Sequence, residues 1–268
     1  MAIITVSRHI GSFGDKIART VADKLNYDYI DKPEIAEALA DYGLRIHDIE
    51  KFDEKGLSFW ESFSQQKKRF LYLIKAVISD FAKKGNVVIY GWGAQVLFKD
   101  LPGVLRVRIT APFEVRMRRL VEQKGYVERN AERTLRKSDR NSAGYISSFF
   151  EADWEDKDLY DLIINTRTIS VDTGVGLIIN TLGAHEFKVS SQETAEKLAD
   201  LTLTQKVEEI LMGFPGLGST KLFVEKRIVN LTGTADSFNT IRECERALSK
   251  IEGIKSVNNQ LYVVEVGD

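Results

Sequence analysis

A short apolar strand, a glycine turn and the start of a helix follow one another in ITVSRHIGSFGDKIA, residues 4–18. The backbone amides of such a turn can point at a phosphate, and the helix adds the positive end of its dipole. The common phosphate-loop pattern places Lys and then Ser or Thr directly after its second glycine. Here Gly14 is followed by Asp15 and Lys16, and a carboxylate at this point would cap the helix but repel a phosphate. These residues alone leave two alternatives, a variant phosphate loop and a plain capped connection.

Apolar strands alternate with amphipathic helices through the first two thirds of the chain. The short apolar runs rich in β-branched residues are 2–7, 27–30, 86–91, 104–110 and 161–166. Such runs are typical of buried parallel strands, and the segments between them carry apolar residues at helical spacing. The alternation predicts an α/β fold, in which helices flank a parallel sheet.

The pattern changes after Leu182. Residues 183–199 are polar and have no sustained period, so we expect a linker there. Residues 200–268 then form a small α+β unit with the expected element order α-β-β-α-β. The sequence therefore predicts a larger domain at 1–182 and a smaller one at 200–268.

Composition and charge restrict the classes of function. The formal net charge is −1, so no overall field favours nucleic acid, and no nucleic-acid partner is expected. The single cysteine, Cys244, excludes an internal disulfide and favours a cytoplasmic protein. The chain enters a strand at once, without a segment typical of a signal peptide or membrane span. His9, His47 and His185 have no neighbours at metal-ligand spacing, so no metal site is expected.

Arginines are concentrated after the strand at 104–110. A first group is Arg116, Arg118 and Arg119, and a second recurs at helical spacing: Arg129, Arg133, Arg136 and Arg140. Guanidinium groups suit phosphoryl transfer because they bind oxygen atoms bidentately and keep their charge. A solvated helix face explains one such stripe equally well. The glycine turn earlier in the chain favours the phosphate-binding interpretation of the stripe.

Residues 1 to 182 resemble the cytidylate-kinase-like proteins, a branch of the P-loop nucleoside monophosphate kinases. The similar segments are ITVSRHIGSFG, YDYID, VVIYGWGAQVLF, LRVRITAPFEVRMRRLVEQKG, RKSDR and DLYDLIINT. The resemblance implies a nucleotide loop at 8–16, a monophosphate-binding region at 31–93 and an arginine-bearing lid at 116–142. It also implies ATP with Mg²⁺ as phosphoryl donor and a cytidylate-type acceptor.

The resemblance and the local pattern together predict the site residues. The expected phosphate-binding residues are Arg8, Gly11, Ser12, Phe13, Gly14 and Asp15, with Lys16 as a second nearby cation. The expected monophosphate-binding residues are Asp31, Gly91, Trp92 and Gly93. Arg116, Arg119 and Arg136 match lid arginines by position, Arg140 extends their clamp, and Asp139 matches an acidic lid position.

Several residues depart from the family pattern. Phe13 stands where the branch has glycine, and Asp15-Lys16 where it has Arg-Glu. Trp92 and Ser142 stand where arginines are expected, and each loss removes a charge-assisted contact of roughly 1.5–3 kcal/mol. Two functions therefore stay open: a nucleoside monophosphate kinase, and a degenerate nucleotide sensor or scaffold.

Residues 200–268 resemble a BON domain, through VEKRIVNLTGTADS and ALSKIEGIKSVNNQLYV. The resemblance implies binding to a protein, a small ligand or a membrane surface. The unit contains no pair of groups typical of catalysis, and Cys244 is expected to be a buried apolar residue. A homodimer through the aromatic helix near residues 58–84 is a further expectation.

Overall fold

The computed structural model describes residues 2–41, 64–187 and 191–263. The chain divides into two compact units, residues 1–191 and 192–268. The first unit contains a five-stranded sheet in the order β2-β3-β1-β4-β5, with every neighbouring pair parallel. Its strands are β1 (Ile3–Arg8), β2 (Asp28–Ile30), β3 (Val87–Tyr90), β4 (Val104–Thr110) and β5 (Leu162–Asn165). The predicted α/β fold is confirmed.

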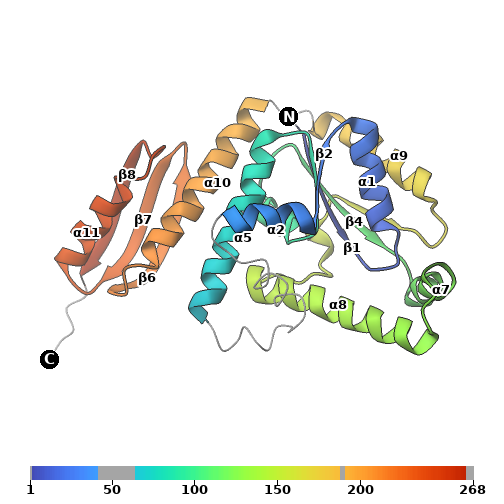
Figure 1. Ribbon diagram of the computed structural model, residues 1–268. Helices are drawn as coiled ribbons and strands as arrows, with labels where there is room; N and C mark the ends of the chain where they lie inside the picture. The colour runs from blue at the N-terminus through green and yellow to red at the C-terminus, as the bar shows by residue number, and fades with distance from the viewer. Residues whose placement is uncertain (1, 42–63, 188–190, 264–268) are drawn as a thin grey trace. The chain divides into compact units, whose positions relative to one another are not determined.

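Helices cover both faces of this sheet (Figure 1). On one face lie α1 (Gly14–Leu25) and α9 (Val171–Leu182), and on the other lie α2 (Lys32–Asp41) and α5 (Ser64–Lys84). Alternation along the strands decides which residue faces which layer: Ile4 and Val6 join the core beneath α1 and α9. The helix expected from residue 58 is described from Ser64 onward, because residues 58–63 lie outside the described part.

Three further helices and two short 3₁₀ turns complete the described part of the first unit. They are α6 (Ala94–Leu97), α7 (Phe113–Lys124), α8 (Glu128–Phe150) and two short 3₁₀ turns, Lys157–Leu159 and His185–Phe187. Figure 1 shows α8 running along the edge at which β1 and β4 end. In the described ranges of both units, no helix has the length and apolar character that a bilayer crossing requires.

The second unit consists of a three-stranded sheet and two helices. Its elements are α10 (Ser191–Leu211), β6 (Leu217–Glu225), β7 (Ile228–Ala235), α11 (Phe238–Leu248) and β8 (Ser256–Val263). The order α-β-β-α-β agrees with the prediction. Strand β7 lies in the middle, antiparallel to β6 and parallel to β8. The resemblance to a BON domain stays a prediction.

The predicted linker is wrong over its second half. Residues 191–199 form the first turns of α10 rather than an irregular connection. The segment QETAEKLADL consists mostly of good helix formers, including Glu, Ala, Lys and Leu. Helix propensity therefore decided this segment, although its polar composition resembled that of a loop.

A buried carboxylate on α10 fixes the hairpin between β6 and β7. The turn residues Lys226 and Arg227 both have positive φ, 50° and 64°, as a two-residue type I′ turn requires. Asp200 is 6% exposed and accepts from both turn amides, at 2.8 Å from the Lys226 nitrogen and 2.7 Å from the Arg227 nitrogen. These bonds hold the turn in a conformation that neither residue favours by itself.

Removal of this carboxylate should loosen the hairpin. We expect Asp200→Ala to lower the free energy of opening β6 and β7 by about 2 kcal/mol, because two charge-assisted hydrogen bonds are lost. Hydrogen exchange with mass spectrometry on the whole protein would measure this as faster exchange in peptides from Leu217–Ala235. The matched control is Glu209→Ala, an exposed carboxylate on the same helix. Equal exchange in the two variants would contradict the role of Asp200.

Candidate functional site

A cavity of about 610 Å³ opens at the carboxyl ends of the parallel strands. In open α/β sheets this edge is where ligands usually bind. The ends of β1 and β3 contribute Ser7, Arg8 and the run from Tyr90 to Gly93, and Asp31 precedes α2. The cavity therefore joins the predicted nucleotide loop to the predicted monophosphate-binding region.

Aromatic side chains and one face of α8 form much of the cavity wall. The aromatic members are Tyr90, Trp92, Tyr145, Phe149 and Trp154. The polar members on α8 are Thr134, Lys137, Ser138, Asn141 and Ser142. These α8 positions recur at three- and four-residue spacing and so share one face of the helix. A wall of this composition suits a flat ring beside polar substituents.

The loop after β1 has the shape of an anion site. Gly11 and Phe13 have φ values of 78° and 62°, and Phe13 precedes α1 without a side-chain cap. The Ser12 hydroxyl is buried and donates to the carbonyls of His9 (2.7 Å) and Ile109 (3.0 Å). It therefore anchors the loop to β4 and does not face a ligand.

Four consecutive loop amides have no acceptor. Among the residues that the structure describes, no group accepts from the backbone N–H of Phe13, Gly14, Asp15 or Lys16. Unpaired amides at the start of a helix can bind an anion. The sequence predicted phosphate contacts in this part of the chain, from the amides of Gly11, Ser12 and Gly14, and that binding stays a prediction.

Two of the predicted lid arginines hold this loop in place. Arg116 is 4% exposed and forms a bidentate pair with Asp139, at 3.0 and 2.8 Å. Arg119 donates to the carbonyl of Gly11 at 3.0 Å and to that of Thr166 at 2.6 Å. Its guanidinium also lies 3.9 Å from the centre of the Phe13 ring. Both arginines thus satisfy the carbonyl side of the loop.

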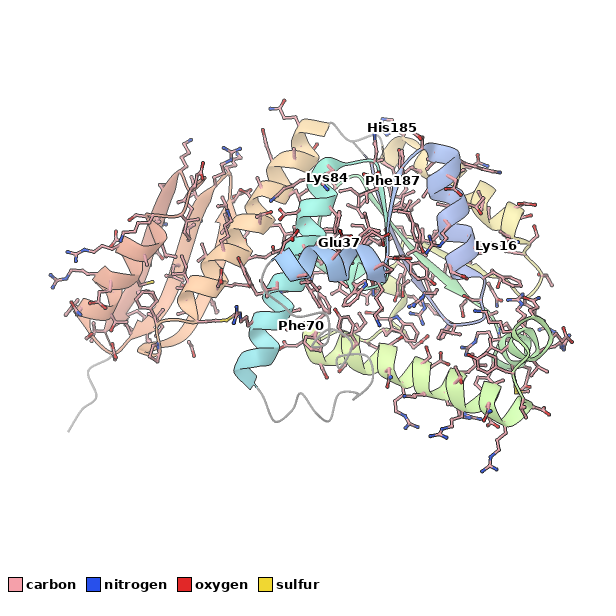
Figure 2. The ribbon with its side chains drawn as sticks, in the orientation of Figure 1. Lys16, Glu37, Phe70, Lys84, His185 and Phe187 are labelled. Atoms are coloured by element: carbon pink, nitrogen blue, oxygen red, sulfur yellow. The ribbon has the colours of Figure 1, made fainter. Side chains whose placement is uncertain are left out.

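The other predicted cations do not gather in one site. Arg136 pairs with Glu132 at 2.9 Å on the surface of α8, and Arg140 is exposed. Asp15 and Lys16 are exposed in the first turn of α1, where Figure 2 labels Lys16. The arginine stripe predicted as the lid face therefore lies beside the face of α8 that lines the cavity, not on it. The helical period was correct, and the neighbouring stripe faces inward.

Among the predicted cations, Arg8 is the one that lines the cavity, beside Lys32 and Lys137, which were not predicted. Its guanidinium carbon lies 4.5 Å from the centre of the Tyr90 ring, and its side chain lines the cavity. Its Nε atom is buried and has no acceptor in the described part of the chain. A buried donor without a partner is uncommon in proteins and indicates a position that an anionic ligand would satisfy.

Asp31 is a buried carboxylate that lines the cavity, just before α2. Its amide donates to Glu34 at 3.1 Å, in the manner of a capping box, and its Oδ2 accepts from Arg19. Its Oδ1 is buried, and no described residue offers it a hydrogen-bond partner. Burial and the neighbouring Glu34 raise the pKa of Asp31 to about 6.

The turn Gly91-Trp92-Gly93 is left-handed throughout, with φ values of 82°, 60° and 77°. A Cβ on Gly93 would lie 2.2 Å from the Phe150 ring, so no side chain fits there. Trp92 adopts a conformation that is costly for a bulky residue. Its carbonyl accepts from the Tyr145 hydroxyl at 3.2 Å, which ties this turn to α8.

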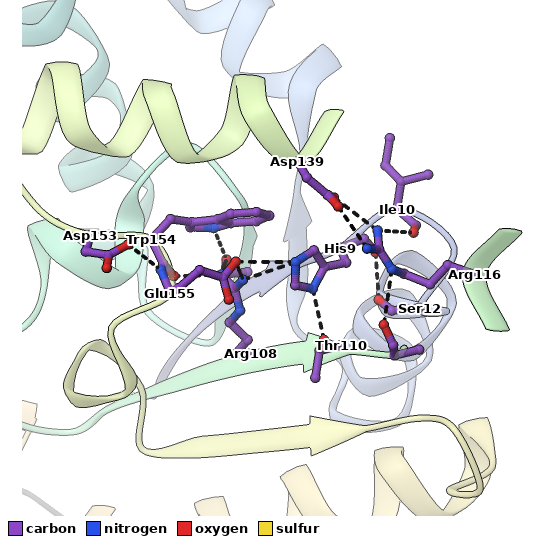
Figure 3. A network of polar contacts seen from close by, with 12 residues as sticks. His9, Ile10, Ser12, Arg108, Thr110, Arg116, Asp139, Asp153, Trp154 and Glu155 are labelled. Atoms are coloured by element: carbon purple, nitrogen blue, oxygen red, sulfur yellow. Dashed lines mark hydrogen bonds and ion pairs between the residues drawn. The ribbon is translucent and has the colours of Figure 1, made fainter. Parts of the chain in front are cut away.

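Sequence reasoning missed a buried network beneath the cavity (Figure 3). Arg108 is 3% exposed and donates to the Trp154 carbonyl (2.8 Å), the Tyr160 hydroxyl (2.9 Å) and Glu155 (2.6 Å). The Trp154 indole donates to Ser7 at 2.9 Å. A charged residue within a strand predicted to be buried was the available signal, because a buried charge needs a partner.

His9 belongs to the same network. Its Nδ1 lies 2.9 Å from the Thr110 hydroxyl, and its Nε2 lies 3.4 Å from Glu155. Burial first, and then the charges of Arg108 and Arg116, lower the pKa of His9. The ring is therefore held as a structural link between the loop and β4. In the described ranges, no three His, Cys, Asp or Glu side chains gather as metal ligands would.

The part of the chain that contains this site is similar to known proteins. The profile of the cytidylate kinase-like family matches residues 3–168. The chain is similar to a cytidylate kinase of Haloarcula marismortui, 27% identical over 165 residues, which cover 61% of this chain and 80% of that protein. It is also similar to a cytidylate kinase of Methanocaldococcus jannaschii, 24% identical over 182 residues, covering 67% and 96% of the two chains.

A solved structure shares the fold. The crystal structure of an uncharacterized protein from Eubacterium ventriosum has a TM-score of 0.51 and 22% identity, covering 69% of this chain and all of that one. At this identity the likeness concerns the fold alone. The family profile, by contrast, covers more than half of the 268 residues, including the loop, the cavity turn and α8. The chain therefore belongs to the cytidylate kinase-like family.

Proposed function

We propose that the first unit binds ATP at the loop after β1 and transfers its γ-phosphoryl group to a cytidylate-type nucleoside monophosphate. The observation that carries the proposal is the continuity of two features. The unpaired amides from Phe13 to Lys16 closely follow Arg8 and Ile10 in the chain, and those two residues line a 610 Å³ cavity with aromatic walls. The two cytidylate kinases named above support the acceptor class.

In the proposed reaction, an acceptor phosphate oxygen bonds to the γ-phosphorus, the bond to the β–γ bridging oxygen breaks, and ADP leaves. No protein nucleophile is required, because positioning and charge stabilisation supply the catalysis. Mg²⁺ bound together with ATP would supply positive charge that offsets the charge of the phosphates. Asp15 is an exposed carboxylate in the same stretch of chain as the free amides. Mg²⁺ prefers oxygen ligands, so Asp15 would be a ligand for it.

The cavity supplies contacts for the acceptor. The aromatic walls formed by Tyr90, Trp92 and Trp154 suit a nucleobase. The free Oδ1 of Asp31 suits a hydroxyl or amino donor of the ligand. Lys137, which also lines the cavity, suits its phosphate. Lid closure would bring Arg140 from the surface of α8 toward the phosphates.

A second candidate function is a nucleotide sensor or scaffold without turnover. Two observations favour it: Arg116 is engaged by Asp139, and Phe13 and Trp92 hold left-handed conformations at the site. Calorimetric titration with ATP and CMP separates the two functions. Binding without turnover supports the sensor, and the absence of any nucleotide binding supports a scaffold.

For the second unit we propose a binding role toward a protein, a small ligand or a membrane surface. The resemblance to BON domains supports this role. Alternate residues of β8 are exposed, and Phe223 and Tyr262 are 59% and 61% exposed. We further propose that the protein forms a homodimer. The aromatic composition of the helix near residues 58–84 supports this proposal.

Steady-state assays of the full chain with ATP and each nucleoside monophosphate test the kinase proposal. We expect phosphate-acceptor turnover with CMP or dCMP, and a loss of about 10- to 100-fold in kcat/KM for Arg140→Ala, the value of one charge-assisted contact. Arg140 is exposed, so thermal unfolding should be unchanged.

The matched control is Arg129→Ala, an exposed arginine nearer the start of the same helix. Eleven residues separate it from Arg140, roughly 16 Å along a helix, so its loss should leave kcat/KM unchanged. Turnover equal to that of the acceptor-free reaction would reject the kinase proposal. Equal losses in both variants would show a general charge effect instead of a lid contact.

The raised pKa of Asp31 predicts a pH effect on acceptor use. The carboxyl takes up a proton as pH falls through about 6, and a protonated carboxyl is a poorer acceptor for ligand donors. We expect kcat/KM for the acceptor to fall on the acid side of this pH. The acceptor phosphate also titrates near pH 6, so the wild-type profile should be steeper than that of Asp31→Asn.

The matched control for this profile is Asp28→Asn, an exposed carboxylate on the same strand segment. It should retain the steep wild-type profile between pH 5 and pH 8, a range chosen to span roughly the pKa of Asp31. Identical slopes for the wild type and Asp31→Asn would show that Asp31 does not contact the acceptor.

A further inference from the structure

The conformation of the loop decides how it corresponds to the common phosphate-loop pattern. In that pattern, G-x-x-x-x-G-K-[ST], the second glycine precedes the lysine at the point where the helix begins, and glycine is the residue that most readily takes a positive φ. In this chain Phe13 has the positive φ, 62°, whereas Gly14 is the first residue of α1. Phe13 therefore corresponds to the second glycine and Gly14 to the lysine. Counting back, Arg8 corresponds to the first glycine.

Arg8 and Gly14 are in contact, and only one of them can carry a side chain. A Cβ on Gly14 would lie 2.6 Å from the Cβ of Arg8 and 2.9 Å from its Cγ. Real side chains essentially never approach so closely, so a lysine at position 14 is excluded while Arg8 is present. Relative to the common pattern, the cation and the glycine therefore stand at each other's positions, with Arg8 in place of a glycine and Gly14 in place of the lysine.

The Arg8 side chain leads from this contact into the cavity. Its guanidinium lies over Tyr90, and a Cβ on Gly91 would lie 3.9 Å from its Nη1. Its Nε is buried without an acceptor. The same cavity holds a second such atom, Oδ1 of Asp31, on a residue that is only 8% exposed. Two unsatisfied polar atoms of opposite character indicate a ligand with an anionic end and a hydrogen-bond donor.

Three other cations near the loop are already engaged or face outward. Arg116 is paired with Asp139, and Arg119 donates to the carbonyls of Gly11 and Thr166. Lys16 is exposed on α1. In the described residues, no carboxylate lies within ion-pair distance of Arg8. Its charge is therefore available for a ligand.

We propose that Arg8 supplies, from the end of β1, the positive charge that a P-loop lysine supplies from the first turn of the helix. This inference rests on the proposed function, because the ligand is the phosphate chain of ATP where it meets the acceptor. The guanidinium contacts phosphate oxygens and exchanges no proton with them. Its position between the free amides and the cavity wall suits contact with the group in transfer.

The first test removes the charge and keeps most of the shape. Arg8→Gln should weaken binding of a fluorescent ATP analogue, and lower kcat/KM, by about 10- to 100-fold. Arg8→Lys should retain part of both quantities. Lys24→Gln, an exposed cation in the last turn of α1, is the matched control and should behave as the wild type.

The second test reverses the exchange. Gly14→Lys should lose function or folding because its side chain meets Arg8, and Arg8→Gly should lose function because the cation is absent. The double variant Arg8→Gly/Gly14→Lys should fold, as judged by circular dichroism, and bind the ATP analogue at least tenfold more tightly than Arg8→Gly, since lysine is restored in its usual position. A folded double variant no better than Arg8→Gly would overturn the proposed exchange.

Failure of this inference is distinguishable from failure of the proposed function. A wild type that neither binds the ATP analogue nor turns over CMP rejects both. A wild type that binds ATP while Arg8→Gln retains full affinity and rate rejects only the role of Arg8. A loss in Lys16→Gln without a loss in Arg8→Gln would reject it as well, and would assign the charge to Lys16.

Discussion

The guanidinium of Arg108 is buried beneath the cavity, and the placement of the site depends on how its charge is satisfied. An unpaired cation in this position would be strongly unfavourable. The chain satisfies it with the Trp154 carbonyl, the Tyr160 hydroxyl and Glu155, and the Trp154 ring lies 3.9 Å away. These contacts fix the segment after α8 against β4, and they set Trp154 in the cavity wall.

Arginines serve two different purposes around the loop. Arg116 and Arg119 bind its carbonyls and the neighbouring Asp139, which keeps the amides of the following residues turned outward and free. Arg8, by contrast, lies on an aromatic ring with a buried nitrogen unsatisfied. In our proposal, the arginines that hold the backbone leave ligand binding to Arg8, at the end of β1. A count of arginines in the sequence does not separate these purposes.

Much of the fold follows from local pattern. The strand predicted at 104–110 is observed as Val104–Thr110, because a continuous β-branched run between turn residues is a strong local signal. The glycine turn and the Asp31 helix start were also located by local signals. The predicted arginine clamp was not assembled, since a helical period fixes a stripe but not the direction in which the stripe points. The linker at 191–199 was wrong because polar composition was weighted above helix propensity.

The sequence by itself determined the α/β alternation, the position of the glycine loop after β1 and the turn after β3, because each depends on a few neighbouring residues. Only the tertiary structure decided which arginines pair with other groups and which one lines the cavity. That choice depends on contacts between residues far apart in the chain: Arg108 with Trp154, Arg116 with Asp139, and the close approach of Arg8 to Gly14. Steric exclusion and charge pairing act across space, and spacing along the chain does not encode them.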